Sequence, residues 1–280
     1  MVRFVLALVA ALSLATTAQA CGDADHACKV EGGVYYITKP EGVENPPALL
    51  FLHGWAGSGR GEVRNTAMRR AAHVAGYALI APQGSRIKSR KRGHYWNAGG
   101  FSGPTLRDDV AYLTRVADDA AERFGLDRSR MVLGGFSGGG MMTWRAACNA
   151  PEAFHAFAPV AGLLWRPLPE TCAGPVRLRH VHGWTDRIVP IEGRPIGRLE
   201  QGDLFKGMTM LRRTNGCAVD TPGQSLPEED KLVRRWNNCA PGSALELVLH
   251  PRGHSVPKGW TTRTLTWSDG LTARSAPPEG

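Results

Sequence analysis

The strongest constraint on the fold is a series of short, almost wholly apolar runs that alternate with segments of helical periodicity. Such runs are typical of strands that are buried on both faces, and the helical segments between them cover the sheet. Helices are expected over residues 62–74, 105–125 and 138–148. This alternation predicts an α/β protein with a parallel sheet and helices on both faces. The expected strands are PALLFLHG (47–54), YALIAP (77–82), RMVLGG (130–135), FHAFAPVAG (154–162), VRLRHVHG (176–183) and ALELVLH (244–250).

The first 20 residues have the pattern of a secretory signal. A single Arg3 precedes an apolar run, and Ala18-Gln19-Ala20 matches a signal-peptidase site. The run is shorter than the roughly 20 apolar residues that span a bilayer, so no stable membrane insertion is expected. Residues 1–20 are therefore predicted to be removed and the protein to be secreted, to the periplasm or the extracellular space. Cys21 is expected to be unlipidated, because Ala18 stands where a lipidation signal carries a leucine-like residue.

The remaining length, residues 21–280, suits one large α/β domain better than two small ones. No internal repeat and no linker rich in Ser, Thr or Pro interrupts it. We expect a single catalytic domain, with residues 275–280 as a disordered tail.

The six cysteines form an even set, which in an exported chain predicts disulfides. Six cysteines allow 15 pairings, and pairing by proximity in the sequence is the expectation. No CxxC occurs and the spacings match no zinc pattern, so neither a metal nor a cofactor is predicted. The expected pairs are Cys21–Cys28, Cys148–Cys172 and Cys217–Cys239.

The net charge of +9 is partly concentrated in RIKSRKR, residues 86–92, which holds five cationic side chains. The simplest interpretation is a solvated loop. The alternative is attraction to an anionic wall polymer, a membrane surface or an acidic substrate. Nucleic acid is excluded as a partner, because the chain has an export signal and no recognised nucleic-acid motif.

The stretch GGFSGGG, residues 134–140, lies between an expected strand and an expected helix. Within it, residues 135–139 match GxSxG, in which a sharp turn exposes a serine. Glycines two positions before and after that serine leave the space the turn requires. No lysine follows the glycines and no GxGxxG register occurs, which argues against a phosphate loop. Ser137 is predicted to be a nucleophile, and a purely structural glycine turn is the alternative.

A serine nucleophile needs a base, and that base needs a carboxylate to orient it. In the strand–GxSxG–helix context the chain order is serine, acid, histidine. Asp186 follows the strand at 176–183, and His254 follows the strand at 244–250. The carboxyl ends of parallel strands meet at one edge of the sheet. The sequence therefore predicts a Ser137, Asp186 and His254 triad.

Other acids and histidines fit the triad less well. His182 precedes the acid, and His250 belongs to the last strand itself. Asp203 is expected within a helix. Asp108 and Asp109 are adjacent on a helix and diverge by about 100°, so they do not form a glycosidase pair. Their expected role is a favourable charge in the first turn of that helix.

An ester carbonyl that is attacked by a serine develops an oxyanion, which needs hydrogen-bond donors. The backbone N–H of Gly138 directly follows the nucleophile. The second donor is expected from the loop after the strand at 47–54, at the Trp55 N–H. His53 is expected to shape that loop and to take no part in the chemistry.

Several of these segments together resemble the secreted polyhydroxybutyrate depolymerase-like and feruloyl esterase-like α/β-hydrolases. They are LLFLHGWAGSG, YWNAG, the run from Arg107 to Met142, PEAFHAFAPVAG, HGWTDRIVP and RGHSVP. The resemblance implies an α/β-hydrolase fold and hydrolysis of carboxylic esters. It also places Trp96 and Asn97 near the site. The chain departs from the family at Arg252 and Val256, where a glycine and a tryptophan are usual.

These patterns predict a secreted, metal-independent serine esterase. Hydroxyalkanoate polyesters or their oligomers are the expected substrates, and feruloyl or acetyl esters of plant polysaccharide are the alternative. Trp55, Trp96 and Trp184 are expected to line an apolar slot for an aromatic acyl group, and a place in the buried core is the alternative for each. A serine peptidase on the same fold and a non-catalytic binding protein are the remaining alternatives.

Overall fold

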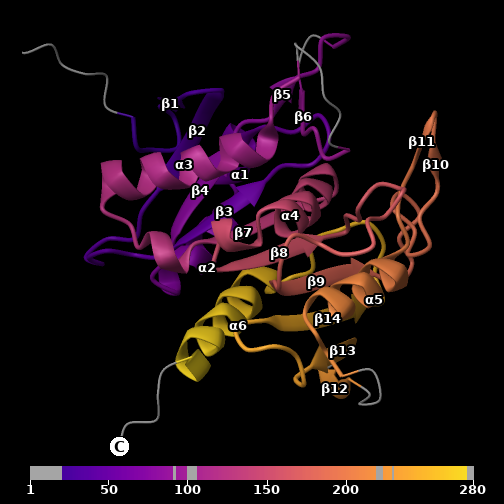
Figure 1. The fold of residues 1–280 in the computed structure, drawn as a ribbon. Helices are drawn as coiled ribbons and strands as arrows, with labels where there is room; N and C mark the ends of the chain where they lie inside the picture. The colour runs from indigo at the N-terminus through magenta and orange to yellow at the C-terminus, as the bar shows by residue number, and fades with distance from the viewer. Residues whose placement is uncertain (1–20, 91–92, 100–105, 219–222, 229, 276–280) are drawn as a thin grey trace, which may run out of the picture.

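The computed structural model describes residues 21–90, 93–99, 106–218, 223–228 and 230–275. The expected signal segment, two cations of the basic run (Lys91 and Arg92) and residues 276–280 of the expected tail lie outside the described residues. Ser275, the first residue of that expected tail, is helical. A ten-stranded sheet runs through the centre of the molecule (Figure 1). Its strands, in spatial order, are β1 (Cys28–Val30), β2 (Gly33–Thr38), β4 (Ala78–Pro82), β3 (Ala48–Leu52), β7 (Val132–Phe136), β8 (Ala156–Val160), β9 (Arg177–Gly183), β14 (Ala244–His250), β13 (Lys231–Trp236) and β12 (Gln224–Glu228).

The central strands, from β4 to β14 in that order, are parallel. They coincide with the apolar runs that predicted strands, and the α/β prediction is confirmed. Two antiparallel strands extend the sheet at each edge. These edge strands were not predicted, because their side chains alternate between buried and exposed and give no continuous apolar run.

Helices cover both faces of the sheet. Side chains of α3 (Asp109–Phe124), α4 (Gly138–Asn149) and α5 (Leu204–Thr214) belong to one apolar cluster. Side chains of α2 (Thr66–Val74) and α6 (Trp260–Ser275) belong to the other. Strand β3 divides its side chains between the two clusters in alternation, as expected for a strand buried on both faces. None of the helices in the described part of the chain is both long and apolar enough to cross a bilayer.

Capping side chains correct two of the expected helix boundaries. The helix expected over residues 62–74 is two helices, α1 (Gly59–Val63) and α2, because Asn65 caps the second by accepting from the Met68 N–H. Asp203, expected inside a helix, lies before α5 and accepts from the Lys206 N–H. Short 3₁₀ turns, η1 (Arg128–Arg130) and η2 (Pro151–Ala153), precede β7 and β8.

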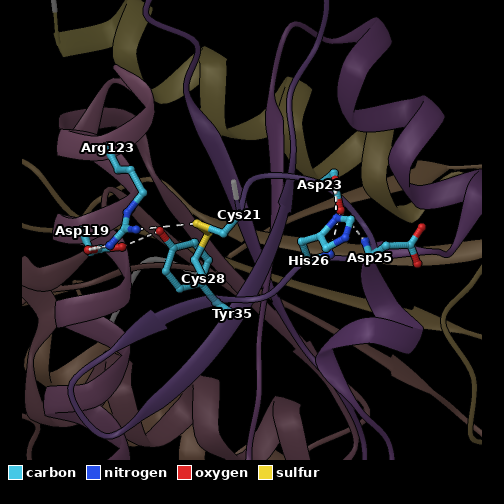
Figure 2. The surroundings of a disulfide bond; sticks show 8 residues. All are labelled: Cys21, Asp23, Asp25, His26, Cys28, Tyr35, Asp119 and Arg123. Atoms are coloured by element: carbon cyan, nitrogen blue, oxygen red, sulfur yellow. Dashed lines mark hydrogen bonds and ion pairs between the residues drawn. A yellow bond between two sulfur atoms is a disulfide. The ribbon is translucent and has the colours of Figure 1, made fainter. Parts of the chain in front are cut away.

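Three disulfides link Cys21 to Cys28, Cys148 to Cys172 and Cys217 to Cys239. They are the same pairs that proximity in the sequence predicted. The first holds the start of the described chain against β1 (Figure 2). Beside it, Arg123 of α3 donates to Asp119 at 2.7 Å, and Tyr35 of β2 donates to the same carboxylate.

Two small hairpins project from the side of the molecule where the parallel strands end (Figure 1). One consists of β5 (Ser85–Arg86) and β6 (His94–Tyr95), and the other of β10 (Pro195–Ile196) and β11 (Leu199–Glu200). Both contribute side chains to the cavity described below.

Candidate active site

Ser137 occupies the sharp turn between β7 and α4. Its backbone has φ 56° and ψ −117°, in the left-handed half of conformational space that a side chain rarely adopts. A Cβ on Gly135 would lie 2.5 Å from the Gly139 carbonyl oxygen, and one on Gly139 would lie 2.1 Å from the Leu52 carbonyl oxygen. The turn is therefore open only to glycine at these two positions, and it presents the serine at the end of the sheet.

His254 lies between Ser137 and Asp186. Its Nε2 is 3.0 Å from Ser137 Oγ, and its Nδ1 is 2.7 Å from Asp186 Oδ2. Ser137 follows β7, Asp186 follows β9 and His254 follows β14, so three parallel strand ends bring the residues together. The distances suit the direct relay of a proton from a hydroxyl to an imidazole that a carboxylate orients.

Asp186 is held on both carboxylate oxygens. The Ile188 and Val189 backbone amides donate to Oδ1 at 2.8 Å and 2.9 Å, while Oδ2 faces His254. Burial alone would raise the pKa of Asp186, but the His254 contact and the two amides outweigh it and hold the pKa below its ordinary value. The group is therefore a carboxylate at neutral pH.

The backbone amides expected as oxyanion donors lie close to the serine. Gly138 is the first residue of α4, so its N–H has no acceptor within the helix. The Trp55 nitrogen lies 3.4 Å from the position of a Cβ on Gly138, and a Cβ on Gly54 would lie 3.4 Å from Ser137 Cβ. The two loops thus bring both amides to one side of Ser137.

A cavity of about 500 Å³ opens beside Ser137. Loops after β3 and β7 and the two projecting hairpins all contribute residues to its lining. Its size lies in the range of about 300–1,000 Å³ that suits small organic ligands. Aromatic and apolar side chains supply much of the lining, namely Trp55, Tyr95, Trp96, Met141, Trp165 and Ile188.

Of the four residues expected near the substrate, three line this cavity, namely Trp55, Trp96 and Asn97. The Trp96 indole N–H donates to the His53 carbonyl at 2.9 Å. Trp184 does not line the cavity. Its side chain is 60% exposed, on the loop between β9 and Asp186.

Asp109 has a role that the sequence did not indicate. It is 2% exposed, pairs with Arg107 and accepts from the Asn97 backbone N–H at 2.6 Å. Arg107 in turn lies over the Tyr112 ring, 3.8 Å from its centroid. The carboxylate therefore fixes the segment that carries Trp96 and Asn97. Its capping neighbour Asp108 accepts from the first amides of α3, as a charge in the first turn predicts.

His53 shapes the loop that carries Trp55. Its Nδ1 lies 2.8 Å from the Gly54 carbonyl oxygen, so that nitrogen carries the proton. The opposite nitrogen accepts from the Gly84 N–H at 3.1 Å. Burial lowers the pKa of His53 to about 4, so the ring is neutral at neutral pH and holds two loops together.

The fold and this site define the class of protein. The architecture is shared with an acetyl xylan esterase from Aspergillus awamori, whose solved structure matches with a TM-score of 0.62 at 16% identity and covers 86% of this chain and 94% of that chain. The sequence model of the prolyl oligopeptidase family matches residues 73–165, which include the serine turn. The chain has the α/β-hydrolase fold.

Relatives in sequence identify the family. The chain is 31% identical over 244 residues to the putative esterase NocK of Nocardia uniformis subsp. tsuyamanensis, covering 77% of this chain and 67% of NocK. It is 28% identical over 236 residues to feruloyl esterase C of Emericella nidulans, covering 81% and 77% of the two chains. The chain therefore belongs to the feruloyl esterase-like family of α/β-hydrolases and is a serine hydrolase that acts on carboxylic esters.

A third relative matches over only part of its length. The bifunctional acetylxylan esterase/xylanase XynS20E of Neocallimastix patriciarum is 28% identical over 217 residues, which are 75% of this chain and 29% of that protein.

Proposed function

We propose that Ser137 is the nucleophile of this esterase. Its Oγ attacks the ester carbonyl carbon while His254 Nε2 takes the hydroxyl proton. His254 then donates that proton to the leaving alkoxide oxygen, which departs as an alcohol and leaves an acyl group on the serine. Water, deprotonated by the same imidazole, attacks the acyl carbon and releases the acid. The distances of 3.0 Å and 2.7 Å along Ser137, His254 and Asp186 support this sequence.

The other groups act on the charge that develops. Asp186 keeps the His254 proton on Nδ1 and stabilises the imidazolium that forms in each step. The Gly138 and Trp55 amides donate to the oxyanion of each tetrahedral intermediate. This set of groups needs no metal ion to activate either the serine or the water.

Within ester hydrolysis, we propose aromatic acyl esters of polysaccharide, of the feruloyl kind, as the substrate class. The observation that carries this proposal is the cavity of about 500 Å³ beside Ser137, with Trp55, Tyr95 and Trp165 among its walls. A planar phenolic acyl group fills such a space by contacts between aromatic rings. An acetyl group would leave most of the cavity to water. The relatives named feruloyl esterase support the same choice.

Basic side chains in the hairpin of β5 and β6 support an acidic polymer as the alcohol component of the ester. The chain has no acidic residue between Arg86 and Arg107, and Lys88 and Arg90 are exposed. Tyr95, at the end of the same hairpin, lines the cavity. Cations on this hairpin attract a polysaccharide that carries uronate groups, and salt weakens that attraction. We also propose that the protein works outside the cytoplasm, because three disulfides suit an oxidising compartment.

A panel of esters tests the substrate class. We expect kcat/KM for methyl ferulate to exceed that for methyl acetate and for a hydroxybutyrate trimer by at least about 10-fold, since filling an apolar pocket gains roughly 1–3 kcal/mol. A higher kcat/KM for the trimer would instead identify a hydroxyalkanoate esterase. Peptide anilides cleaved faster than any ester would identify a peptidase.

Charge reversal tests the acidic polymer. The double variant Lys88→Glu/Arg90→Glu should lose several-fold in kcat/KM on a feruloylated uronate oligosaccharide at low salt, and little on methyl ferulate. The matched control is Arg70→Glu/Arg213→Glu, which makes the same change in net charge on α2 and α5, away from the cavity. Equal losses in the two double variants would reject the local attraction.

A further inference from the structure

A line of hydrogen bonds runs beneath the triad through three buried rings that the reaction does not touch. The Trp144 indole Nε1 donates to His180 Nδ1 at 3.0 Å. His180 Nε2 is 3.0 Å from His182 Nδ1, and His182 Nε2 is 2.8 Å from the Val189 carbonyl oxygen. The same His182 nitrogen is 3.6 Å from Asp186 Oδ2, the oxygen that faces His254.

The order of donors and acceptors along these hydrogen bonds is fixed at the Trp144 end. An indole N–H can only donate, so His180 Nδ1 must accept and its proton must stand on Nε2. That proton is donated to His182 Nδ1, which places the proton of His182 on Nε2 as well. His182 therefore donates its N–H to the Val189 carbonyl, and the same nitrogen lies 3.6 Å from Asp186 Oδ2.

Both imidazoles are neutral in this arrangement. His180 and His182 are fully buried, and burial lowers the pKa of each below its ordinary value. A charged His180 would have no lone pair for the indole. A charged His182 would compete with His254 for the negative charge of Asp186, which would weaken the base.

We propose that Trp144, His180 and His182 are positioning residues for Asp186. Trp144 lies on α4, the helix that begins immediately after Ser137, and His180 and His182 lie on β9, which leads to Asp186. The line of hydrogen bonds thus joins the helix behind the serine to the loop of the acid. It orients an N–H toward the carboxylate oxygen that holds His254, and it supports the Val189 carbonyl of the segment whose amides bind the other oxygen. This inference rests on the triad chemistry proposed above.

Nitrogen NMR of histidine-labelled protein tests the arrangement directly. We expect both His180 and His182 to be neutral with the proton on Nε2, and the Trp144→Phe variant to lose that fixed state. A proton on Nδ1 of either ring in the wild-type protein would overturn the proposal. This measurement needs no enzymatic activity, so its result is independent of the proposed function. The proposed function would instead be contradicted by a Ser137→Ala protein that is still active.

Kinetics separate positioning from mere packing. Trp144→Phe should lower kcat by about 10-fold and change KM by less than about two-fold, because the ring does not line the cavity. The matched control is Trp260→Phe, since Trp260 is also buried and its indole N–H has no partner among the described residues. An equal fall in kcat for the two variants would show that Trp144 contributes only packing and would overturn its positioning role.

The pH profile tests His182. In His182→Leu the Asp186 carboxylate loses the N–H dipole that lies 3.6 Å from its Oδ2, so it holds the His254 proton more firmly. The acid limb of kcat/KM, which reports the catalytic base, should move up by about half a pH unit. His182→Gln, whose amide N–H can reach the same acceptors, should return the limb toward its wild-type position. A limb that does not move in His182→Leu would overturn the proposal.

Discussion

The acid side of the triad and the rim of the cavity differ sharply in construction. Asp186 is buried, is held by two backbone amides and one imidazole, and lies above a line of buried rings. The rim consists of short hairpins with exposed Ile196 and Leu199 and an exposed Trp55. The parallel sheet and its strand ends fix the groups that we propose to be catalytic. Additions to that sheet form the surface that we propose selects the substrate, so changes to the two regions should have different kinetic signatures.

Among changes to these two regions, the largest effect on kcat is expected from substitution of Asp186. Asp186→Asn should lower kcat by about 10⁴-fold with KM little changed, because the amide no longer holds the productive tautomer of His254. Steady-state kinetics on p-nitrophenyl acetate measure this. The control is Asp203→Asn, where asparagine caps α5 as well as aspartate does and kcat should stay at the wild-type value. A loss below about 10-fold in Asp186→Asn would remove Asp186 from the triad.

The next effect concerns the buried support of the cavity wall. Asp109→Ala should lower the free energy of unfolding by about 3 kcal/mol, because it leaves Arg107 without its carboxylate partner in a buried site. Denaturant titration measures the change. Asp118→Ala, which removes the exposed partner of Arg128, should cost less than about 1 kcal/mol. If the two variants lost the same free energy of unfolding, Asp109 would stabilise the protein no more than a surface ion pair does.

A smaller effect should distinguish two exposed tryptophans. Trp55 and Trp184 are 59% and 60% exposed, but only Trp55 lines the cavity. Trp55→Ala should lower kcat/KM for methyl ferulate by about 10-fold, the loss of one aromatic contact, while its backbone amide remains. Trp184→Ala should change it by less than about two-fold. A comparable loss at Trp184 would make it a substrate contact, as the sequence predicted.

The smallest effect is a dependence of stability on pH at Glu62 in α1. Burial raises its pKa from the ordinary 4.5 to about 7. The folded state therefore binds this proton more tightly than the unfolded state, and the stability it contributes is lost as the pH rises from 4.5 to 7. Glu62→Gln should be more stable than the wild type by about 1 kcal/mol at pH 8 and equal to it at pH 4.5. Thermal unfolding at the two pH values measures this difference in stability. The control is Glu152→Gln, at an exposed position.

Much of this architecture could be predicted because the central strands are continuous apolar runs and the triad residues follow three of them. The order of serine, acid and histidine along the chain then selected Asp186 and His254 from several candidates. The edge strands were missed, since β13 alternates buried Val233 with exposed Leu232 and Arg234 and has no apolar run.

Contacts between distant segments were also beyond the reach of the sequence. Asp109 was assigned only a favourable charge at a helix start, because nothing in its neighbourhood along the chain shows that it accepts from Asn97. The pairing of Trp144 with His180 depends on how α4 packs against β7 and β8, so that Trp144 reaches β9. Trp184 was expected in the acyl slot, whereas it lies outside the cavity lining.

The central claim is that Ser137 is the nucleophile. A fluorophosphonate probe, followed by peptide mass spectrometry, tests it most directly, because the probe bonds to a serine that an adjacent base activates. The account predicts a single labelled residue, Ser137, and a Ser137→Ala protein that takes no label and loses ester hydrolysis by about 10⁴-fold or more. A folded Ser137→Ala protein that hydrolyses p-nitrophenyl acetate at the wild-type rate, or a label on another residue, would contradict it.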